Sequence, residues 1–139
     1  MADDVSTNRI VPIVRYMIVC ENWRLISEGN NLVGIDGLID TLRAIDDPPY
    51  PLLYEELCVF LALTSGRGNG EGYLVCENDD LGIEVFRTRP RPIEFGSDPL
   101  EVVGVPYRIR DCPFPKPGVY AFQFWYNGVE VERRLVNLR

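Results

Sequence analysis

The clearest pattern in the chain is an aromatic residue at every second position near its C-terminal end. A period of two is typical of a strand with one buried face, and the Asn127-Gly128 pair that follows favours a tight hairpin turn, because both residues tolerate positive φ. We therefore predict a β-hairpin whose first strand packs an aromatic face into the core. The aromatic residues at every second position are Tyr120, Phe122, Phe124 and Tyr126.

A two-residue turn also predicts how the two strands of this hairpin pair. Counted outward from the turn, the opposed residues are Tyr126 with Val129, Phe124 with Val131, Phe122 with Arg133, and Tyr120 with Leu135. Arg133 is the polar exception on this apolar face. We expect it near the margin of the sheet, with its aliphatic stem packed and its guanidinium in water.

Other segments also show strand patterns, separated by turn residues. They are the Val- and Ile-rich run 10–20, a segment starting near Leu32, and the segments 73–76, 81–86 and 100–109. Residues 52–63 are apolar on both parities, which fits a buried strand or a buried helix; we choose a strand because strands surround it. Four alternating glycines in 65–72 suggest a flexible connection. About eight mostly antiparallel strands without a long helix predict an all-β sandwich or barrel.

The length and composition fit one domain. We expect a flexible N-terminus at residues 1–9 and a single β-sandwich domain at residues 10–139. The acidic start and the lack of a long apolar run suggest a cytoplasmic protein. The net charge of −7 repels phosphate and anionic lipid at long range, so we expect neither nucleic acid nor membrane as a partner.

The chain contains no histidine, which removes Ser-His, Cys-His and His-metal sites. The four cysteines lack zinc-finger spacing, and we interpret them as reduced, buried residues; a four-thiolate metal site and a reactive thiol are the alternatives. We predict no catalytic residue, no metal and no cofactor. Glu77, Asp79 and Asp80 leave a hard-cation site open beside the simpler interpretation of a turn. The cysteines are Cys20, Cys58, Cys76 and Cys112.

Two segments carry a family resemblance. The stretch Pro113 to Phe122 followed by Asn127-Gly128, together with Leu32 to Asp36, resembles an uncharacterised family of small bacterial β-sandwich proteins. The same stretch is similar to the penultimate strand of immunoglobulin-like domains, in which a tyrosine hydroxyl closes a corner. The resemblance implies an immunoglobulin-like sandwich and no known activity. Phe122 stands where such domains carry their second cysteine, so we expect no inter-sheet disulfide.

Several side chains are candidates for binding. Trp125 and Gln123 lie on the parity opposite the aromatic core face and predict an outer patch, or else a surface covered by a second packing layer. Trp23 is the other large aromatic candidate. Arg87, Arg89 and Arg91 share one parity and indicate either an anion site or a charged edge that discourages aggregation.

These features favour a non-enzymatic protein-interaction module. Its expected partner is another protein or a second copy of the chain, paired along the C-terminal strand or through the patch around Trp125. The alternative is a sandwich that binds a small ligand or carbohydrate beside Trp125 or Trp23. A carboxylate-dependent enzyme is the second alternative.

Overall fold

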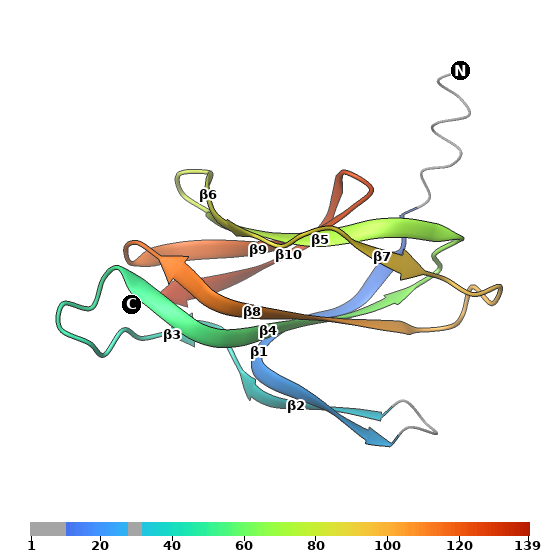
Figure 1. Cartoon of the computed structure of the whole chain (residues 1–139), viewed down its shortest axis with the longest axis horizontal. Coiled ribbons are helices and arrows are strands. Elements are labelled where there is room, and N and C mark those ends of the chain that lie inside the picture. Colours follow the sequence, from blue (N-terminus) through green and yellow to red (C-terminus); the bar gives the residue numbers. More distant parts are fainter. Residues whose placement is uncertain (1–10, 28–31) are drawn as a thin grey trace.

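Two β-sheets packed face to face make up the computed structural model, which describes residues 11–27 and 32–139 (Figure 1). The described residues contain no helix, and the predicted all-β sandwich is confirmed. The ten strands are β1 (Ile13–Ser27), β2 (Leu32–Leu38), β3 (Thr41–Leu42), β4 (Leu52–Thr64), β5 (Asn69–Asn78), β6 (Ile83–Arg87), β7 (Arg91–Glu94), β8 (Val103–Phe114), β9 (Gly118–Tyr126) and β10 (Val129–Leu138).

The strand order separates the two layers. One sheet has four strands in the order β2-β1-β4-β8, and the other has the order β3-β10-β9-β5-β6, with β7 also pairing with β5. The short strand β3 runs parallel to the end of β10, and the other pairings are antiparallel. Because β3 pairs with Asn137 and Leu138, it covers part of the C-terminal strand's outer edge, which we had expected to be open.

The core lies between the two sheets. The aromatic face of β9 is buried as predicted, with Tyr120, Phe122 and Phe124 fully covered. The inward positions of β4 oppose it, which settles residues 52–63 as a strand. The outward positions of β4 are buried too, and this explains its apolar residues on both parities. Inward are Leu57, Val59, Leu61 and Leu63, and outward are Cys58, Phe60 and Ala62.

The predicted register of the C-terminal hairpin is wrong beyond its first pair. Tyr126 does stand opposite Val129, but a bulge between Glu130 and Glu132 inserts one extra residue in β10. Past the bulge every partner moves by one position and the faces exchange. The observed pairs are Phe124 with Glu132, Gln123 with Arg133, Phe122 with Arg134, and Tyr120 with Val136.

The glycine-rich segment is also more ordered than predicted. Strand β5 begins at Asn69, so Gly70 and Gly72 lie within it and pair with β7. A Cβ atom built on Gly70 would lie 2.0 Å from the Tyr126 hydroxyl, and one on Gly72 would lie 2.5 Å from Ile93 Cδ1. These glycines are therefore required by close packing and not by flexibility.

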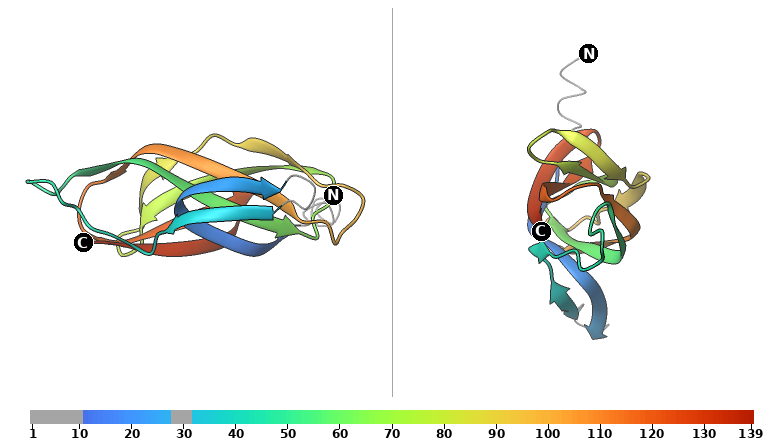
Figure 2. Two further views of the ribbon diagram at one scale, coloured as in Figure 1. Left: turned by 90° about the horizontal axis from the view of Figure 1, so that it is seen from below. Right: turned by 90° about the vertical axis from the view of Figure 1, so that its left-hand side faces the viewer.

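Strand β1 belongs to two different pairings. Residues 13–20 pair with β4, and residues 20–27 pair with β2, so Cys20 takes part in both. The end of β1 and β2 form a two-stranded arm that extends beyond the packed sheets, below them in the right-hand view of Figure 2. The predicted flexible segment 1–9 and the turn at 28–31 lie outside the described residues.

Candidate functional site

A cleft with a volume of about 680 Å³ lies between this arm and the outer face of the four-stranded sheet. In Figure 1 the end of β1 and β2 pass beneath β4 and β8, which together provide the opposite wall. Eleven of the twelve lining residues are uncharged, and Glu101 is the exception. The lining consists of Tyr16, Ile18, Trp23, Leu25, Val33, Ile35, Phe60, Ala62, Glu101, Val102, Gly104 and Pro106.

The cleft exists because β1 bends back on itself. Tyr16 and Ile18 have even numbers and Trp23 and Leu25 have odd numbers, so in a straight strand the two pairs would point to opposite faces. Both pairs nevertheless line the same cleft. The bend turns the apolar side of the arm toward the sheet.

The arm itself is amphipathic in the manner of a half-buried strand pair. Trp23 stands opposite Ile35, and Leu25 stands opposite Val33, so four apolar side chains from two strands share one face. Arg24, between Trp23 and Leu25, and Asp36, next to Ile35, are exposed and form an ion pair of 3.3 Å. The arm therefore presents an apolar face to the cleft, and its other face carries this ion pair beside the exposed Ile26 and Leu38.

Two aromatic rings of the cleft lining contact each other. The ring centroids of Trp23 and Phe60 lie 5.6 Å apart with an interplanar angle of 37°. Phe60 stands opposite Pro106 on β8, and Ala62 stands opposite Gly104. Gly104 leaves room for the Phe60 ring, since a Cβ atom at position 104 would lie 3.2 Å from Phe60 Cζ.

The loop between β7 and β8 closes one side of the cleft. The Thr64 hydroxyl donates to the carbonyl oxygens of Pro99 at 3.1 Å and Glu101 at 3.3 Å. The backbone N–H of Ser65 donates to Pro99 as well. These bonds hold Glu101 and Val102 beside the end of β4, so the rim of the cleft is fixed to the sheet.

The other tryptophan lies on the outer face of the six-stranded sheet. Trp125 is half-buried, its ring is nearly parallel to that of Tyr73 with centroids 6.1 Å apart, and its indole N–H donates to Gln123 Oε1 at 2.9 Å. Gln123 is buried beneath it. The indole N–H group of Trp125 thus already has a hydrogen-bond acceptor within the chain.

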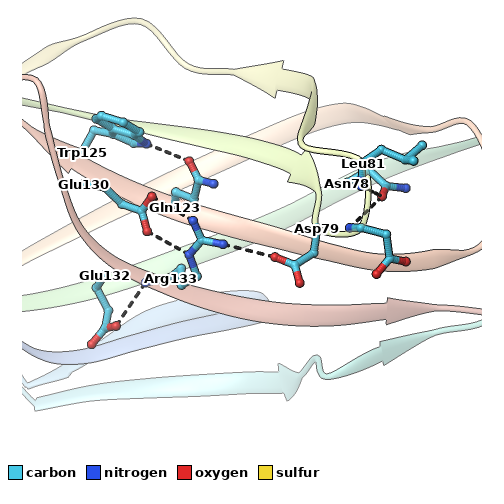
Figure 3. A network of polar contacts seen from close by, with 9 residues as sticks. Asn78, Asp79, Leu81, Gln123, Trp125, Glu130, Glu132 and Arg133 are labelled. Carbon is cyan, nitrogen blue, oxygen red and sulfur yellow. Dashed lines mark hydrogen bonds and ion pairs between the residues drawn. The ribbon is translucent and has the colours of Figure 1, made fainter.

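A charged network continues from this tryptophan along β9 and β10 (Figure 3). Arg133 binds both carboxylate oxygens of Glu130 at 2.8 and 2.9 Å and donates to Asp79 at 3.1 Å. The hydrogen bond with Glu130 raises the pKa of the Arg133 guanidinium. Arg133 was expected near the margin of the sheet, on the same parity as the core face; the bulge in β10 places it on this outer face, where its charge is paired.

The three candidate arginines do not form one ladder. Strand β6 ends at Arg87, and β7 begins at Arg91, so Arg89 lies between two strands. Arg87 pairs with Glu84 at 2.8 Å and lies over the Tyr73 ring. Arg91 lies over the Tyr107 ring at 5.0 Å and donates to the carbonyl of Pro106. The structure therefore gives Arg87 and Arg91 separate partners.

The side chains of the acidic turn after β5 form hydrogen bonds and an ion pair within the chain. The Asn78 side chain accepts from the backbone N–H groups of Asp80 and Leu81 at 3.0 and 3.1 Å (Figure 3). Asp79 is engaged with Arg133. Within residues 11–27 and 32–139, no three His, Cys, Asp or Glu side chains gather as metal ligands.

Sequence reasoning identified one residue of the cleft, Trp23, and missed the others. The structure does not bring Trp23 together with Trp125, because they lie on different sheets. A signal for the missed residues was present in the alternation of apolar positions in 23–25 and 33–35. In the described chain, no helix has the length and apolar character needed to cross a membrane.

No protein-family model matches the chain, and no curated protein matches it. Among solved structures, the chain is similar to the Pseudomonas fluorescens alkylpurine DNA glycosylase AlkC bound to DNA containing an abasic site analog, with 12% sequence identity and a TM-score of 0.49. The match covers 92% of this chain and 30% of that chain, so the chain spans less than a third of the other protein's length.

This match corrects two of our predictions. We expected a non-enzymatic protein-interaction module, with a protein or a second copy as partner and no nucleic acid, whereas the matched protein is an enzyme bound to DNA. We withdraw both predictions. Their weakness is physical: a net charge of −7 is a sum over the whole chain and does not locate any single arginine, and the lack of histidine excludes only the mechanisms that use it.

Proposed function

We propose that this domain binds a small, mainly apolar ligand in the cleft between the β1–β2 arm and the four-stranded sheet. The observation that carries the proposal is the cleft itself, whose volume of about 680 Å³ is walled by apolar side chains from β1, β2, β4 and β8. Ligand sites commonly have volumes of about 300–1,000 Å³ and a mostly apolar lining with few polar groups.

The exposure of the cleft walls supports the same proposal. Tyr16, Leu25 and Val102 line the cleft and are 56%, 47% and 42% exposed. Each Å² of apolar surface removed from water is worth roughly 25 cal/mol. A ligand that covers these side chains therefore gains binding energy that the free protein leaves unused.

The lining also restricts the class of ligand. Trp23 and Phe60 offer aromatic faces, which favour a ring system or a compact hydrocarbon body. Glu101 is the single charged group of the lining, so a carboxylate or phosphate on the ligand is disfavoured. Few polar groups are available to hold sugar hydroxyls, which favours an apolar ligand over the carbohydrate alternative.

Titration with N-phenyl-1-naphthylamine, a neutral apolar dye, tests the proposal. We expect its fluorescence to rise and saturate as it enters the cleft. The variant Leu25→Glu should weaken binding at least tenfold, because it places a charge in the apolar wall. The matched control is Leu135→Glu, which makes the same change at a 52% exposed position on β10, outside the cleft lining.

The comparison of these two variants decides the matter. Equal dye binding by both variants and the wild-type chain would place the dye elsewhere and contradict the proposal. A wild-type chain that binds no dye would contradict it as well. Thermal unfolding of both variants verifies that the added charge has not disrupted the sheet.

A further inference from the structure

The four cysteines form two contacting pairs in space. Cys20 of β1 contacts Cys58 of β4, and Cys76 of β5 contacts Cys112 of β8, although the members of each pair are more than thirty positions apart in the sequence. All four are buried and carry free thiols. The sequence spacing gave no indication of this pairing, because it depends on strand register and on how the sheets face each other.

The first pair has the backbone geometry of a disulfide site. Cys20 and Cys58 stand directly opposite each other in the antiparallel pairing of β1 with β4. Opposed residues in such a pairing have Cα atoms about 4.5–5.5 Å apart, and disulfides span Cα distances of about 4.4–6.8 Å. Their side chains share one face of the sheet and touch, so a bond needs no movement of the strands.

This pair lies on the outer face of the sheet and not in the inter-sheet core. Cys76 and Cys112 belong to the core cluster, whereas Cys20 and Cys58 do not. Arg108 stands opposite Cys58 and donates to Glu56 at 3.0 Å and to Asn22 at 3.2 Å. Asn22 and Glu56 lie two positions from the two cysteines, and the Arg108 side chain is 46% exposed.

We propose that Cys20 and Cys58 form a reversible disulfide when the protein meets a small peroxide. The pair closes the base of the arm, at the residue where β1 passes from its pairing with β4 to its pairing with β2. Both cysteines are buried, at 0% and 1% exposed, and the pair lies on the outer side of the sheet. The inference is independent of any ligand in the cleft.

The reaction balances with hydrogen peroxide as the oxidant. The sulfur of one cysteine attacks a peroxide oxygen, the O–O bond breaks, and water leaves with the thiol proton, which gives a sulfenic acid. The second sulfur then attacks the sulfenic sulfur, the S–O bond breaks, and a second water leaves with the remaining thiol proton. Two thiols are oxidised to one disulfide, and one peroxide is reduced to two waters.

The hydrogen bond between the thiols affects the two sulfurs differently. Burial raises the pKa of both thiols, that of Cys58 to about 12. The hydrogen bond between them acts in opposite directions, lowering the pKa of Cys20 and raising that of Cys58. These directions favour Cys20 as the sulfur that attacks first and Cys58 as the resolving thiol.

Mass spectrometry of the full chain tests this proposal. The double variant Cys76→Ala/Cys112→Ala leaves only the first pair, and it is treated with hydrogen peroxide, unfolded in alkylating reagent and digested without reduction. We expect loss of both alkylatable thiols together, a mass lower by two hydrogen atoms, and a cross-linked peptide that contains Cys20 and Cys58. A reductant should restore both thiols.

A triple variant with Cys58→Ala added is the matched control, and it should gain oxygen instead of losing hydrogen. If the double variant fails to fold, peptide mapping of the oxidised wild-type chain identifies the same link. Two thiols that stay alkylatable, that oxidise separately to sulfinic acid, or that link different chains would overturn the proposal.

Discussion

The hydroxyl of Tyr120 donates a hydrogen bond of 2.8 Å to the backbone carbonyl of Lys116, four residues earlier. Tyr120 is fully buried, and its ring packs edge-on against Phe114 at 4.9 Å. The bond therefore fixes the proline-rich approach to β9 against the core. The resemblance to immunoglobulin-like domains implied a tyrosine hydroxyl that closes a corner, and the assignment to such a family stays a prediction.

Replacing this hydroxyl should destabilise the fold. We expect Tyr120→Phe to lower the free energy of unfolding by about 1 kcal/mol, because the Lys116 carbonyl loses a buried partner. The matched control is Tyr107→Phe, whose hydroxyl is buried and has no hydrogen-bond partner among the described residues. That change should be neutral or stabilising in urea unfolding. A larger loss for Tyr107→Phe than for Tyr120→Phe would contradict the assignment.

Tyr107 should also shape the stability of the protein at alkaline pH. Burial raises its pKa from 10.0 to about 12, with Arg91 acting in the opposite direction. Because Tyr107 holds its proton more tightly in the folded than in the unfolded chain, its full contribution to the free energy of unfolding is present below pH 10. That contribution falls as the pH rises from 10 and is lost above about 12. We expect Tyr107→Phe to flatten the fall in melting temperature across that window. Tyr54→Phe, at a half-buried site, is the control and should change this fall in melting temperature less. If the melting temperature of Tyr107→Phe falls with pH as steeply as that of the wild-type chain, Tyr107 does not determine the alkaline stability.

The bulge in β10 can be tested by two adjacent residues. Val136 is fully buried opposite Tyr120, whereas Leu135 is 52% exposed. Val136→Ala should cost about 2 kcal/mol of stability, since it removes core volume. Leu135→Ala should change stability by no more than about 0.5 kcal/mol. If chemical denaturation shows a larger loss of stability for Leu135→Ala than for Val136→Ala, the register without a bulge is the correct one.

The glycine in the middle of β5 offers a test of close packing. A Cβ atom on Gly72 would lie 2.5 Å from Ile93 Cδ1 and 2.9 Å from the Tyr107 hydroxyl. Gly72→Ala should therefore destabilise the protein by about 1–3 kcal/mol. The control is Gly96→Ala, where the nearest atom is the mobile end of Glu101 at 3.1 Å. An unchanged melting temperature for Gly72→Ala would show that the site relaxes freely.

The parts of the fold that depend on local chemistry could be predicted from the sequence. The Asn127-Gly128 turn and the aromatic alternation of β9 fix a hairpin and its buried face without information from distant residues. The bulge could not be predicted, because Val131 is apolar and fits the simple register equally well. The pairs beyond the bulge, such as Val136 with Tyr120 in the core, reveal the extra residue.

The cleft could not be derived for a related reason. Alternating apolar residues around Trp23 and Ile35 look the same whether they face a core or an open cleft. The difference lies in the bend of β1 near Cys20, which a period-two pattern does not record. The length of β1, with one half pairing with β4 and the other with β2, is the feature from which the cleft follows.

Trp23 provides the sharpest test of the proposed binding site. Its ring lies against Phe60 within the cleft, while Trp125 lies on the other sheet with its N–H bound to Gln123. We expect Trp23→Ala to weaken binding of N-phenyl-1-naphthylamine by about 30-fold, since a central aromatic contributes about 2 kcal/mol or more to binding. Trp125→Ala is the matched control and should leave the dye affinity unchanged. In a Trp125→Phe background, the remaining tryptophan emission should respond to the dye and saturate with it, because the only indole then lies in the cleft. An affinity lost with Trp125 and kept without Trp23 would assign the binding surface to the six-stranded sheet.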